Sequence, residues 1–395
     1  MLDTILDTRL KDLVYRHNGF LSRLSITFMP TKAVDKKIFD YFTKDDVFVV
    51  FNDPKATVAQ MLKDRFPEAR IIIIDPWGFF VDSLTREGWE CYNKIDRIPK
   101  MNQRPVLLIN SPYTDGTQSK TNQYVLHQEN AINKLNPIAM VSWAPDNFLL
   151  GDHGIVQHRK NCEKKFGKPV FVKWLNQNRD WNGSIRIDTV STVWDGRVKD
   201  KTSTVKARYS DNEYEITFKD LYIPAESREE FEYISSIQTQ DKVVVKGFNP
   251  TGRKAKQVQI KVGNKFEVID GLEYDSNNKL HRQAVSYMRS ESLIDVPPGP
   301  SVPSKYKELC CRYSPTADQS TSLKFGRYMR SGHTRWLVSI RYNTRSLDSP
   351  ALSLVPIIDL DVLPDNFNDA DLFKYFDTPT SIQAKILDIG HKSPY

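Results

Sequence analysis

The chain has 395 residues, of which 39% are hydrophobic and 27% charged, and a formal net charge of +7. This length exceeds what one hydrophobic core usually organises, so we expect two domains. The composition is ordinary for a soluble protein, and no apolar run is long enough to cross a bilayer, which argues against a membrane role. Four cysteines without zinc-site spacing are too few for a disulfide framework, so a reducing cytoplasm is expected. The positive charge slightly favours an anionic partner.

The N-terminal half of the sequence has the pattern of an α/β domain. Residues 1–18 carry apolar side chains at helical spacing and predict an amphipathic helix. From 47 to 195, runs that are apolar throughout alternate with longer polar segments, which is typical of parallel strands covered on both faces by helices. The sequence therefore predicts a three-layer α/β domain with a mostly parallel sheet. We expect its strands at 47–51, 70–75, 105–110, 138–143 and 171–175, and crossover helices at 57–66 and 121–135.

The C-terminal half has a different sequence pattern. Beyond about residue 196, short strand-like runs such as 213–218 and 242–248 alternate with Gly, Asn and Pro turns, and a proline-rich loop spans 295–305. This pattern predicts a β-rich α+β domain. We place the boundary near residue 200, which gives domains 1–200 and 201–395.

The tetrapeptide Asn110-Ser111-Pro112-Tyr113 directly follows an apolar run. In an open parallel sheet, ligands collect beyond the carboxyl ends of the strands, so these residues stand where chemistry is expected. The exocyclic amine of a base is a poor nucleophile that improves when acceptors take its protons, and the Asn110 side-chain oxygen and the Ser111 carbonyl could be those acceptors. Pro112 would stiffen the loop, and the Tyr113 ring could stack on an extruded base. Taken alone, the tetrapeptide also suits an ordinary turn.

This tetrapeptide resembles the catalytic motif Asn/Asp-Pro-Pro-Tyr of S-adenosylmethionine-dependent DNA methyltransferases. The neighbouring segments resemble the other landmarks of that family in the order called gamma, over about residues 28–195. The resemblance implies a Rossmann-like methyltransferase domain followed by a target-recognition domain. It also implies cofactor contacts at several positions. One lies before the first strand and two form an Asp-Pro after it. An acidic residue and a Trp follow the second strand, and a further acidic residue faces the adenine amine. In this sequence those positions are Thr31, Asp53, Pro54, Asp75, Trp77 and Asp96.

The first of these motifs departs from the family pattern. Thr57, Val58 and Ala59 stand where the family has a glycine-rich turn around the methionine part of the cofactor, and Lys55 adds a nearby cation. Glycine lets the backbone approach a ligand closely and adopt positive φ. Its absence opens the alternative of a methylase-like protein that has lost cofactor binding.

Two later segments continue the resemblance. Residues 132–166 resemble the family's Leu-x-Pro-Gly strand, Pro-x-x-Phe-Leu segment and Arg-bearing helix, and residues 178–194 resemble the segment whose aromatic side chain lines the base pocket. Trp181 is the candidate for that wall of the target-base pocket, opposite Tyr113; alternatively, it is an ordinary buried tryptophan. Ile185 to Trp194 would form closing hairpin strands.

Two basic segments, 246–265 and 324–345, lie in the C-terminal half, and the second interleaves arginines with Tyr328 and Trp336. Cations supply affinity for phosphates and Arg reads base edges, so both segments are candidate DNA contacts; a solvated basic face is the alternative. The candidates are Arg253, Lys254, Lys256, Arg327, Arg330, Arg335 and Arg341. His153 and His158 lack a third ligand at a helical step, so we assign no metal.

Together these features favour a site-specific methyltransferase that moves a methyl group from S-adenosylmethionine to N6 of a flipped-out adenine in double-stranded DNA. Asn110 favours adenine, although N4 of cytosine stays open. The alternatives are a catalytically degenerate methylase-like DNA-binding or interaction protein, and a methyltransferase for an RNA or protein amine. A cognate restriction nuclease is a candidate partner, and the cytoplasm of a bacterial or phage-infected cell is the expected location.

Overall fold

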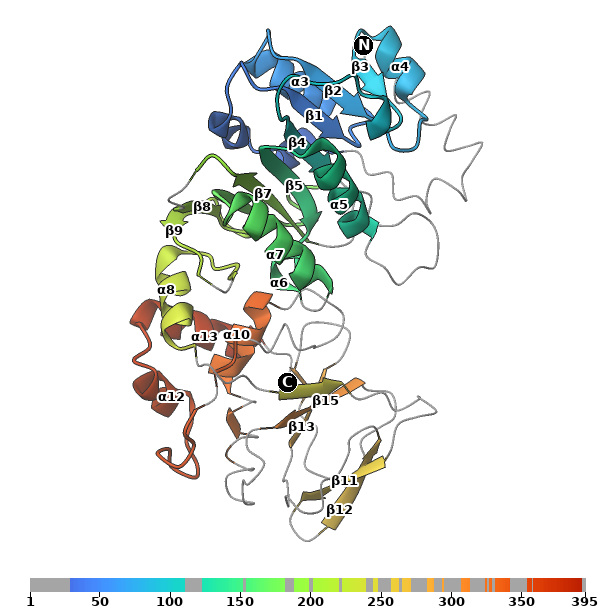
Figure 1. Cartoon of the computed structure of the whole chain (residues 1–395). Helices are drawn as coiled ribbons and strands as arrows, with labels where there is room; N and C mark the ends of the chain where they lie inside the picture. Colours follow the sequence, from blue (N-terminus) through green and yellow to red (C-terminus); the bar gives the residue numbers. More distant parts are fainter. Residues whose placement is uncertain are drawn as a thin grey trace. The chain divides into compact units, whose positions relative to one another are not determined.

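A computed structural model of the chain describes residues 29–110, 123–151, 154–181, 188–198, 202–219 and 222–238, and several segments between 244 and 392 (Figure 1). The chain divides into two compact units, Met1–Tyr222 and Ile223–Tyr395, which are described separately. The helix expected at residues 1–18 lies outside the described residues. No helix in the described part is both long and apolar enough to span a bilayer.

A nine-stranded sheet forms the centre of the first unit, in the order β3-β2-β1-β4-β5-β7-β6-β8-β9. Strands β1 to β5 run parallel to one another, β7 runs antiparallel between β5 and β6, β8 is parallel to β6, and β9 is antiparallel to β8. The strands are β1 Phe48–Phe51, β2 Ile71–Ile74, β3 Glu90–Tyr92, β4 Val106–Asn110, β5 Ala139–Pro145, β6 Phe171–Leu175, β7 Thr189–Asp195, β8 Ser203–Lys206 and β9 Glu213–Ile216.

The five apolar runs predicted as strands are β1, β2, β4, β5 and β6, and the α/β class with a mostly parallel sheet is confirmed. Nearly all of their residues are buried, which fits strands with both faces covered. β7 occupies most of the segment expected to close the sheet. β8 and β9 belong to this same sheet, although the texture of the sequence grouped them with the C-terminal half.

Helices cover both faces of the sheet. On one face, Phe48 and Val50 of β1 pack in a buried cluster with Leu62 of α3 and Phe39 of η2. The other face carries the long helices α5 and α7, described below. The helices of this unit are η1 Thr31–Ala33, η2 Lys36–Tyr41, α3 Thr57–Arg65, α4 Val81–Arg86, η3 Ile95–Arg97, α5 Gln123–Leu135, α6 Asn147–Leu150 and α7 Gly154–Phe166.

Hydrogen bonds join α5 and α7 to the sheet. Gln128 of α5 donates to the Ser142 hydroxyl of β5 at 2.6 Å, and its side-chain oxygen lies 2.9 Å from Nε2 of His158 on α7. His158 is buried, and its Nδ1 lies 3.3 Å from the Glu129 carboxylate. Burial lowers the pKa of His158, against the opposing effect of Glu129. In the described part of the chain, no three His, Cys, Asp or Glu side chains are grouped to hold a metal ion.

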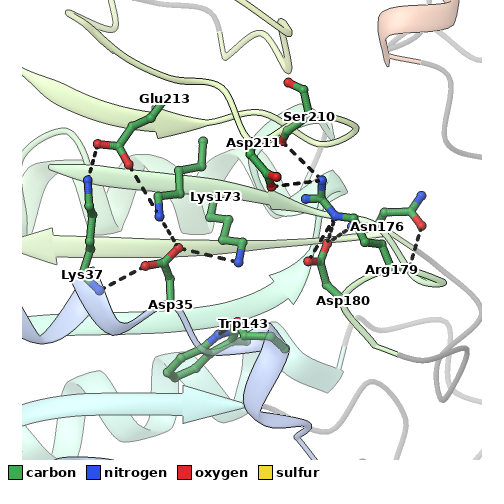
Figure 2. A network of polar contacts seen from close by, with 12 residues as sticks. Asp35, Lys37, Trp143, Lys173, Asn176, Arg179, Asp180, Ser210, Asp211 and Glu213 are labelled. Carbon is green, nitrogen blue, oxygen red and sulfur yellow. Dashed lines mark hydrogen bonds and ion pairs between the residues drawn. The ribbon is translucent and has the colours of Figure 1, made fainter.

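A network of charged side chains fixes the segment before β1 onto the sheet (Figure 2). The Asp35 carboxylate lies 2.6 Å from Nζ of Lys206 and 3.6 Å from Nζ of Lys173, two residues that pair across β8 and β6. Glu213 of β9 bridges Lys206 and Lys37 at 3.5 and 2.5 Å. Burial raises the pKa of Asp35, but the hydrogen bond from Lys206 and the nearby lysines outweigh it and lower the pKa. The segment is therefore held by ion pairs as well as by apolar packing.

The second unit combines helices with short strands. β10, β15, β13 and β14 form a four-stranded sheet in that order, and β11 pairs with β12 in an antiparallel hairpin. Its elements are α8 Arg228–Ser236, β10 Val244–Gly247, β11 Gln257–Val262, β12 Lys265–Asp270, β13 Gln283–Tyr287, β14 Leu293–Ile294, β15 Lys307–Arg312, α10 Gly332–Arg341, α12 Asp369–Tyr375 and α13 Thr380–Lys392. Its assignment as a β-rich recognition domain stays a prediction.

A buried polar contact organises the helical part of this unit. The Tyr233 hydroxyl of α8 lies 2.7 Å from Nε2 of His333 and 2.8 Å from the Thr378 hydroxyl. The His333 ring stacks on Phe376 at a centroid distance of 4.5 Å, and burial lowers the pKa of His333 to about 3. His333 is therefore neutral at physiological pH, and the contact belongs to the packed core.

Candidate functional site

The strand order of the first unit reverses between β1 and β4, because β2 and β3 lie on one side of β1 and β4 and β5 on the other. Open α/β sheets bind ligands at such a switch point, beyond the carboxyl ends of the strands. Three polar residues occupy this edge: Asn52 after β1, Asp75 after β2, and Asn110 at the end of β4. Phe51 pairs with Ile74 on one side and with Ile109 on the other, and each of the polar residues directly follows one of these three. Each polar residue is at most 4% exposed. Buried polar side chains therefore converge at the switch point.

Asn110 lies where the sequence predicted it, at the carboxyl end of a central strand. It pairs across the sheet with Trp143 of β5, whose Nε1 donates to the Ala33 carbonyl of η1 at 3.3 Å. The segment that contains the predicted cofactor residue Thr31 therefore lies against the strand next to Asn110, with the Thr31 side chain exposed. The remaining catalytic candidates, Ser111, Pro112 and Tyr113, lie outside the described residues.

Asn52 connects the ends of β1 and β4, and the sequence analysis did not single it out. Its Nδ2 donates to the backbone carbonyl of Asn110 at 2.8 Å, and its own N–H donates to the Ile74 carbonyl at 2.8 Å. Its φ is +61°, a left-handed conformation that asparagine tolerates better than most residues. An Asn directly after a buried strand and before Asp-Pro was the available signal.

Asp53 caps the first helix after β1. Its carboxylate accepts backbone N–H bonds from Thr57, Val58 and Ala59 at 2.8 to 2.9 Å, so both oxygens serve the N-terminus of α3. Burial raises the pKa of Asp53 to about 6, although the three N–H bonds oppose this effect. Pro54 beside it is buried. The carboxylate that the sequence assigned to the cofactor therefore has a structural task at the same edge.

The missing glycines have a structural explanation. Thr57, Val58 and Ala59 form the first turn of α3 with negative φ, so no glycine is needed there for backbone conformation. Val58 and Ala59 are buried in the core. The positive φ of this loop falls instead on Asn52 and Ala56. Glycines at these positions would, however, leave more room for a ligand beside the first turn of α3.

The capping carboxylate also affects which ligand the helix can take. A free helix N-terminus attracts phosphate groups, as in dinucleotide-binding folds. In α3 the donors of Thr57, Val58 and Ala59 are already bonded to Asp53. This arrangement disfavours a pyrophosphate at α3 and leaves a negative charge at the switch point.

The raised pKa of Asp53 predicts a specific dependence of stability on pH. Because the folded-state pKa of about 6 lies above the ordinary value of 3.8, the native state binds more protons than the unfolded state between these values. The stability contribution is present below pH 4 and is lost as pH rises through 6, by up to about 3 kcal/mol. Asp53→Asn removes this titration while keeping an acceptor for the cap.

Urea denaturation of wild type and Asp53→Asn at pH 4 and pH 7 measures the effect. We expect wild type to lose stability relative to the variant as pH rises. Asp64→Asn, which removes an exposed carboxylate on the same helix, controls for the loss of one charge. A difference between wild type and Asp53→Asn that is the same at both pH values contradicts the prediction.

Asp75 organises the loop after β2. It accepts the backbone N–H of Trp77 at 3.1 Å and that of Phe80 at 2.6 Å. Burial raises the pKa of Asp75 against these bonds. The Trp77 ring meets His127 of α5 edge-on at 6.2 Å, and the His127 ring lies 5.9 Å from that of Phe51 at the end of β1.

Two buried polar atoms near this loop have no hydrogen-bond partner in the part of the chain that the structure describes: Nε1 of Trp77 and Oδ1 of Asn93. Asn93 directly follows β3, and a methyl group added to Gly78 would lie 3.6 Å from its Cβ, so the loops after β2 and β3 touch. A donor and an acceptor without partners indicate a place for a polar ligand. The sequence analysis had placed the corresponding role on Asp96.

Asp96 does not join the other candidates. Its side chain is 64% exposed and lies 2.5 Å from Nζ of Lys134 on α5. The structure therefore brings Asn110, Asp53, Asp75 and the Trp77 loop to one edge, and places Asp96 in a surface ion pair.

Trp181, predicted as a wall of the base pocket or alternatively as an ordinary buried tryptophan, lies in the core of the described structure. It is 0% exposed, belongs to the main apolar cluster, and donates from Nε1 to the Thr189 hydroxyl at 2.7 Å. A tryptophan that follows a buried strand covers much apolar surface when it packs back on the sheet, and here that gain is realised. No face of this ring is open to a base in the described structure.

A buried arginine lies farther along the same edge. Nη2 of Arg208, just after β8, lies 2.7 Å from the Asp146 carboxylate, and Nη1 lies 3.3 Å from that of Asp188. Asp146 follows β5 and Asp188 precedes β7, so the three charges join three strands. The Arg208 side chain is 3% exposed, so the charges are held almost without solvent.

The predicted DNA contacts are only partly described. Arg327 is exposed, with Nη1 3.5 Å from the Phe367 carbonyl, and Arg335 is half-buried on α10. Tyr328 and Trp336, expected among these arginines, are 0% and 2% exposed. Helical periodicity turns them into the core, so they are not available to stack on bases. Outside the described residues lie Arg253, Lys254, Lys256, Arg330 and the side chain of Arg341.

A scan against protein-family models finds no match for this sequence, and a search of curated proteins finds none either. Solved structures with a similar fold include a Listeria monocytogenes protein described as a class I S-adenosylmethionine-dependent methyltransferase, at 12% identity and a TM-score of 0.35 over 46% of this chain. Another is the methyltransferase subunit of a type I restriction-modification system from Streptococcus thermophilus, at 11% identity and a TM-score of 0.32 over 45% of this chain. The type IIG restriction endonuclease BpuSI aligns at 9% identity and a TM-score of 0.38 over 88% of this chain.

The chain spans 66%, 47% and 60% of the lengths of these three proteins. Methyltransferases and restriction-modification proteins are thus among the structures that it resembles. At these TM-scores the similarities assign neither a family nor an activity to this chain.

Proposed function

We propose that this chain is an S-adenosylmethionine-dependent methyltransferase that acts on N6 of adenine in double-stranded DNA. One observation carries the proposal: the buried amide of Asn110 ends a central strand at the switch point, beside two buried carboxylates at the ends of β1 and β2. A planar amine needs acceptors for its protons, and nearby carboxylates favour a positively charged sulfonium donor.

The donor site fits the residues at the ends of β1 to β3. Asp75 would accept hydrogen bonds from ribose hydroxyls, by the logic of acidic residues in dinucleotide folds. The adenine ring presents both donors and acceptors, which match the partnerless Oδ1 of Asn93 and Nε1 of Trp77. Asp53 supplies negative charge near the methionine end, where Thr57 and Val58 restrict the room. When bound, S-adenosylmethionine supplies an activated methyl group.

Asn110 would act on the acceptor. Its side-chain oxygen would accept a hydrogen bond from an N–H of the flipped adenine amine, which makes the nitrogen lone pair more available for in-line attack. Ser111 would supply the second acceptor, and Tyr113 would stack on the base. No strong base is needed before attack, because the donor is already activated.

The wider assignments follow from this proposal. The second unit would read the target sequence through its basic residues, with phosphate contacts supplying affinity. Flipping a base costs a few kcal/mol, which contacts from both units would offset. A cognate restriction nuclease would be the functional partner, in the cytoplasm of a bacterial or phage-infected cell.

A second candidate is a methylase-like protein without cofactor binding. It is favoured by one observation: the carboxylates of Asp53 and Asp75 both bind the chain's own backbone N–H groups, while Val58 fills the core where glycine would leave room. Such a protein would keep DNA binding or a partner surface and would transfer nothing.

Isothermal titration calorimetry separates the two candidates. We expect the full chain to bind S-adenosylmethionine, and to bind NAD at least 100-fold more weakly, because Asp53 occupies the N–H groups that a pyrophosphate would use. Asp75→Ala should weaken the binding by at least tenfold, whereas Asp82→Ala on the exposed face of α4 should leave it unchanged. Absence of heat with S-adenosylmethionine, with or without DNA, favours the degenerate protein.

A further inference from the structure

A side-chain hydrogen bond joins the ends of β1 and β4 and links residues 58 positions apart in the sequence. Nδ2 of Asn52 donates to the backbone carbonyl of Asn110 at 2.8 Å, and both residues are buried. Asn110 is the last residue of β4 and the first of the proposed catalytic tetrapeptide. The carbonyl that receives the bond therefore belongs to the last residue of the strand.

The geometry of Asn52 suits this bond. In regular strand geometry its side chain would follow the alternation of β1, but its φ of +61° turns the backbone after Phe51 out of the strand. The backbone N–H of Asn52 stays bonded to Ile74 of β2. Through these two hydrogen bonds, Asn52 links the turn after β1 to both β2 and β4, at the point where the strand order reverses.

We propose that Asn52 is a positioning residue that holds the Asn110 peptide group, and with it the Asn110 side chain, at the distance that methyl transfer requires. The inference rests on the proposed methyltransferase function. Asn52 immediately precedes Asp53, whose carboxylate caps α3 on the donor side. The same turn therefore contacts the donor side through Asp53, which caps α3, and the end of β4 through Asn52, which binds the Asn110 carbonyl. A displacement of about 1 Å in a reacting group can lower a rate by roughly 100-fold.

Three substitutions of Asn52 separate the hydrogen bond from the backbone conformation. Asn52→Gly adopts positive φ freely and removes only the amide. Asn52→Asp tolerates the same φ but places an acceptor against the Asn110 carbonyl. Asn52→Ala removes the amide and also strains the left-handed backbone. Thermal melting reports whether each variant folds.

The experiment measures transfer of tritiated methyl groups from S-adenosylmethionine to unmethylated bacterial genomic DNA, with the donor saturating and the DNA concentration varied, so that kcat and the KM for DNA are both obtained. For Asn52→Gly we expect kcat to fall about 30- to 100-fold, while the Kd for S-adenosylmethionine and the KM for DNA change less than threefold. The kcat of Asn52→Asp should fall by at least as large a factor. A merely structural role would lower the melting temperature without this split between kcat and KM.

The outcomes are distinguishable. If wild type neither binds S-adenosylmethionine nor labels DNA, the proposed function fails and the role of Asn52 fails with it. If wild type labels DNA and Asn52→Gly and Asn52→Asp keep kcat within fivefold, the positioning role alone is overturned. A change confined to the Kd for the donor, with kcat within fivefold, likewise overturns it, because the bond would then serve only the donor loop.

Discussion

Asn110→Ala is expected to lower methyl transfer to DNA by roughly 100- to 1000-fold, the cost typical of removing one polar group aimed at a reacting centre. Asn110 is 4% exposed and ends β4 at the switch point of the sheet, so the substitution removes a buried amide oxygen from the strand end at which the amine would bind. The backbone carbonyl that Asn52 binds is retained in the variant. Rapid-quench measurement of labelled DNA gives the rate of the chemical step.

Binding and stability separate this effect from a general loss of fold. The Kd for S-adenosylmethionine should stay within threefold of wild type, because Asn110 lies on the acceptor side of the site. Asn102→Ala, at an exposed asparagine in the segment before β4, is the matched control and should transfer at the wild-type rate. Transfer by Asn110→Ala within fivefold of wild type contradicts the catalytic role.

Arg208→Ala is expected to lower the free energy of unfolding by about 3 to 5 kcal/mol. The variant leaves the carboxylates of Asp146 and Asp188 buried at 5% and 8% side-chain exposure, without the guanidinium that compensates them. Their mutual repulsion and lost solvation then act on the junction of β5, β7 and β8. Urea denaturation followed by tryptophan fluorescence measures the loss.

Two further variants test the electrostatic origin of this loss. Arg65→Ala removes an arginine from an ion pair whose partners are 58% and 60% exposed, and should cost less than about 1 kcal/mol. Adding Asp146→Asn and Asp188→Asn to Arg208→Ala removes the uncompensated charges and should recover part of the stability. A loss below about 1 kcal/mol for Arg208→Ala, or no recovery in the triple variant, contradicts the account.

The central sheet was predictable because its signal is local. Runs such as VVF in β1 and IIII in β2 are apolar at every position, which only strands buried on both faces require. The place of Asn110 followed from the same reasoning, since a polar residue that ends such a run stands at the carboxyl edge. The mostly parallel topology was equally accessible from the alternation of strands and helices.

The contacts that complete the site were not predictable, because they join residues distant in sequence. The Asn before Asp-Pro signals a turn with a left-handed residue at Asn52, but nothing local indicates that its amide binds Asn110, 58 positions away. Asp96 looked equivalent to Asp75 as an acidic residue near a strand end, but Lys134 of α5 holds it at the surface.

Aromatic residues gave the least reliable functional signals. Trp181, Tyr328 and Trp336 stood in segments where stacking on bases was expected, and all three are buried. A large ring gains more from packing than from exposure, so its sequence neighbours say little about whether it faces a ligand. For polar residues at strand ends the expected position follows more directly, because burial of an amide or carboxylate requires a specific partner.

The most direct test of the central claim is the nucleoside composition of DNA after incubation with the full chain and S-adenosylmethionine carrying a labelled methyl group. A site that holds the donor at the ends of β1 and β2 and an adenine amine at Asn110 predicts label in N6-methyldeoxyadenosine, lost in Asn110→Ala. DNA without label, or label only in RNA or in protein supplied in the same reaction, would contradict it.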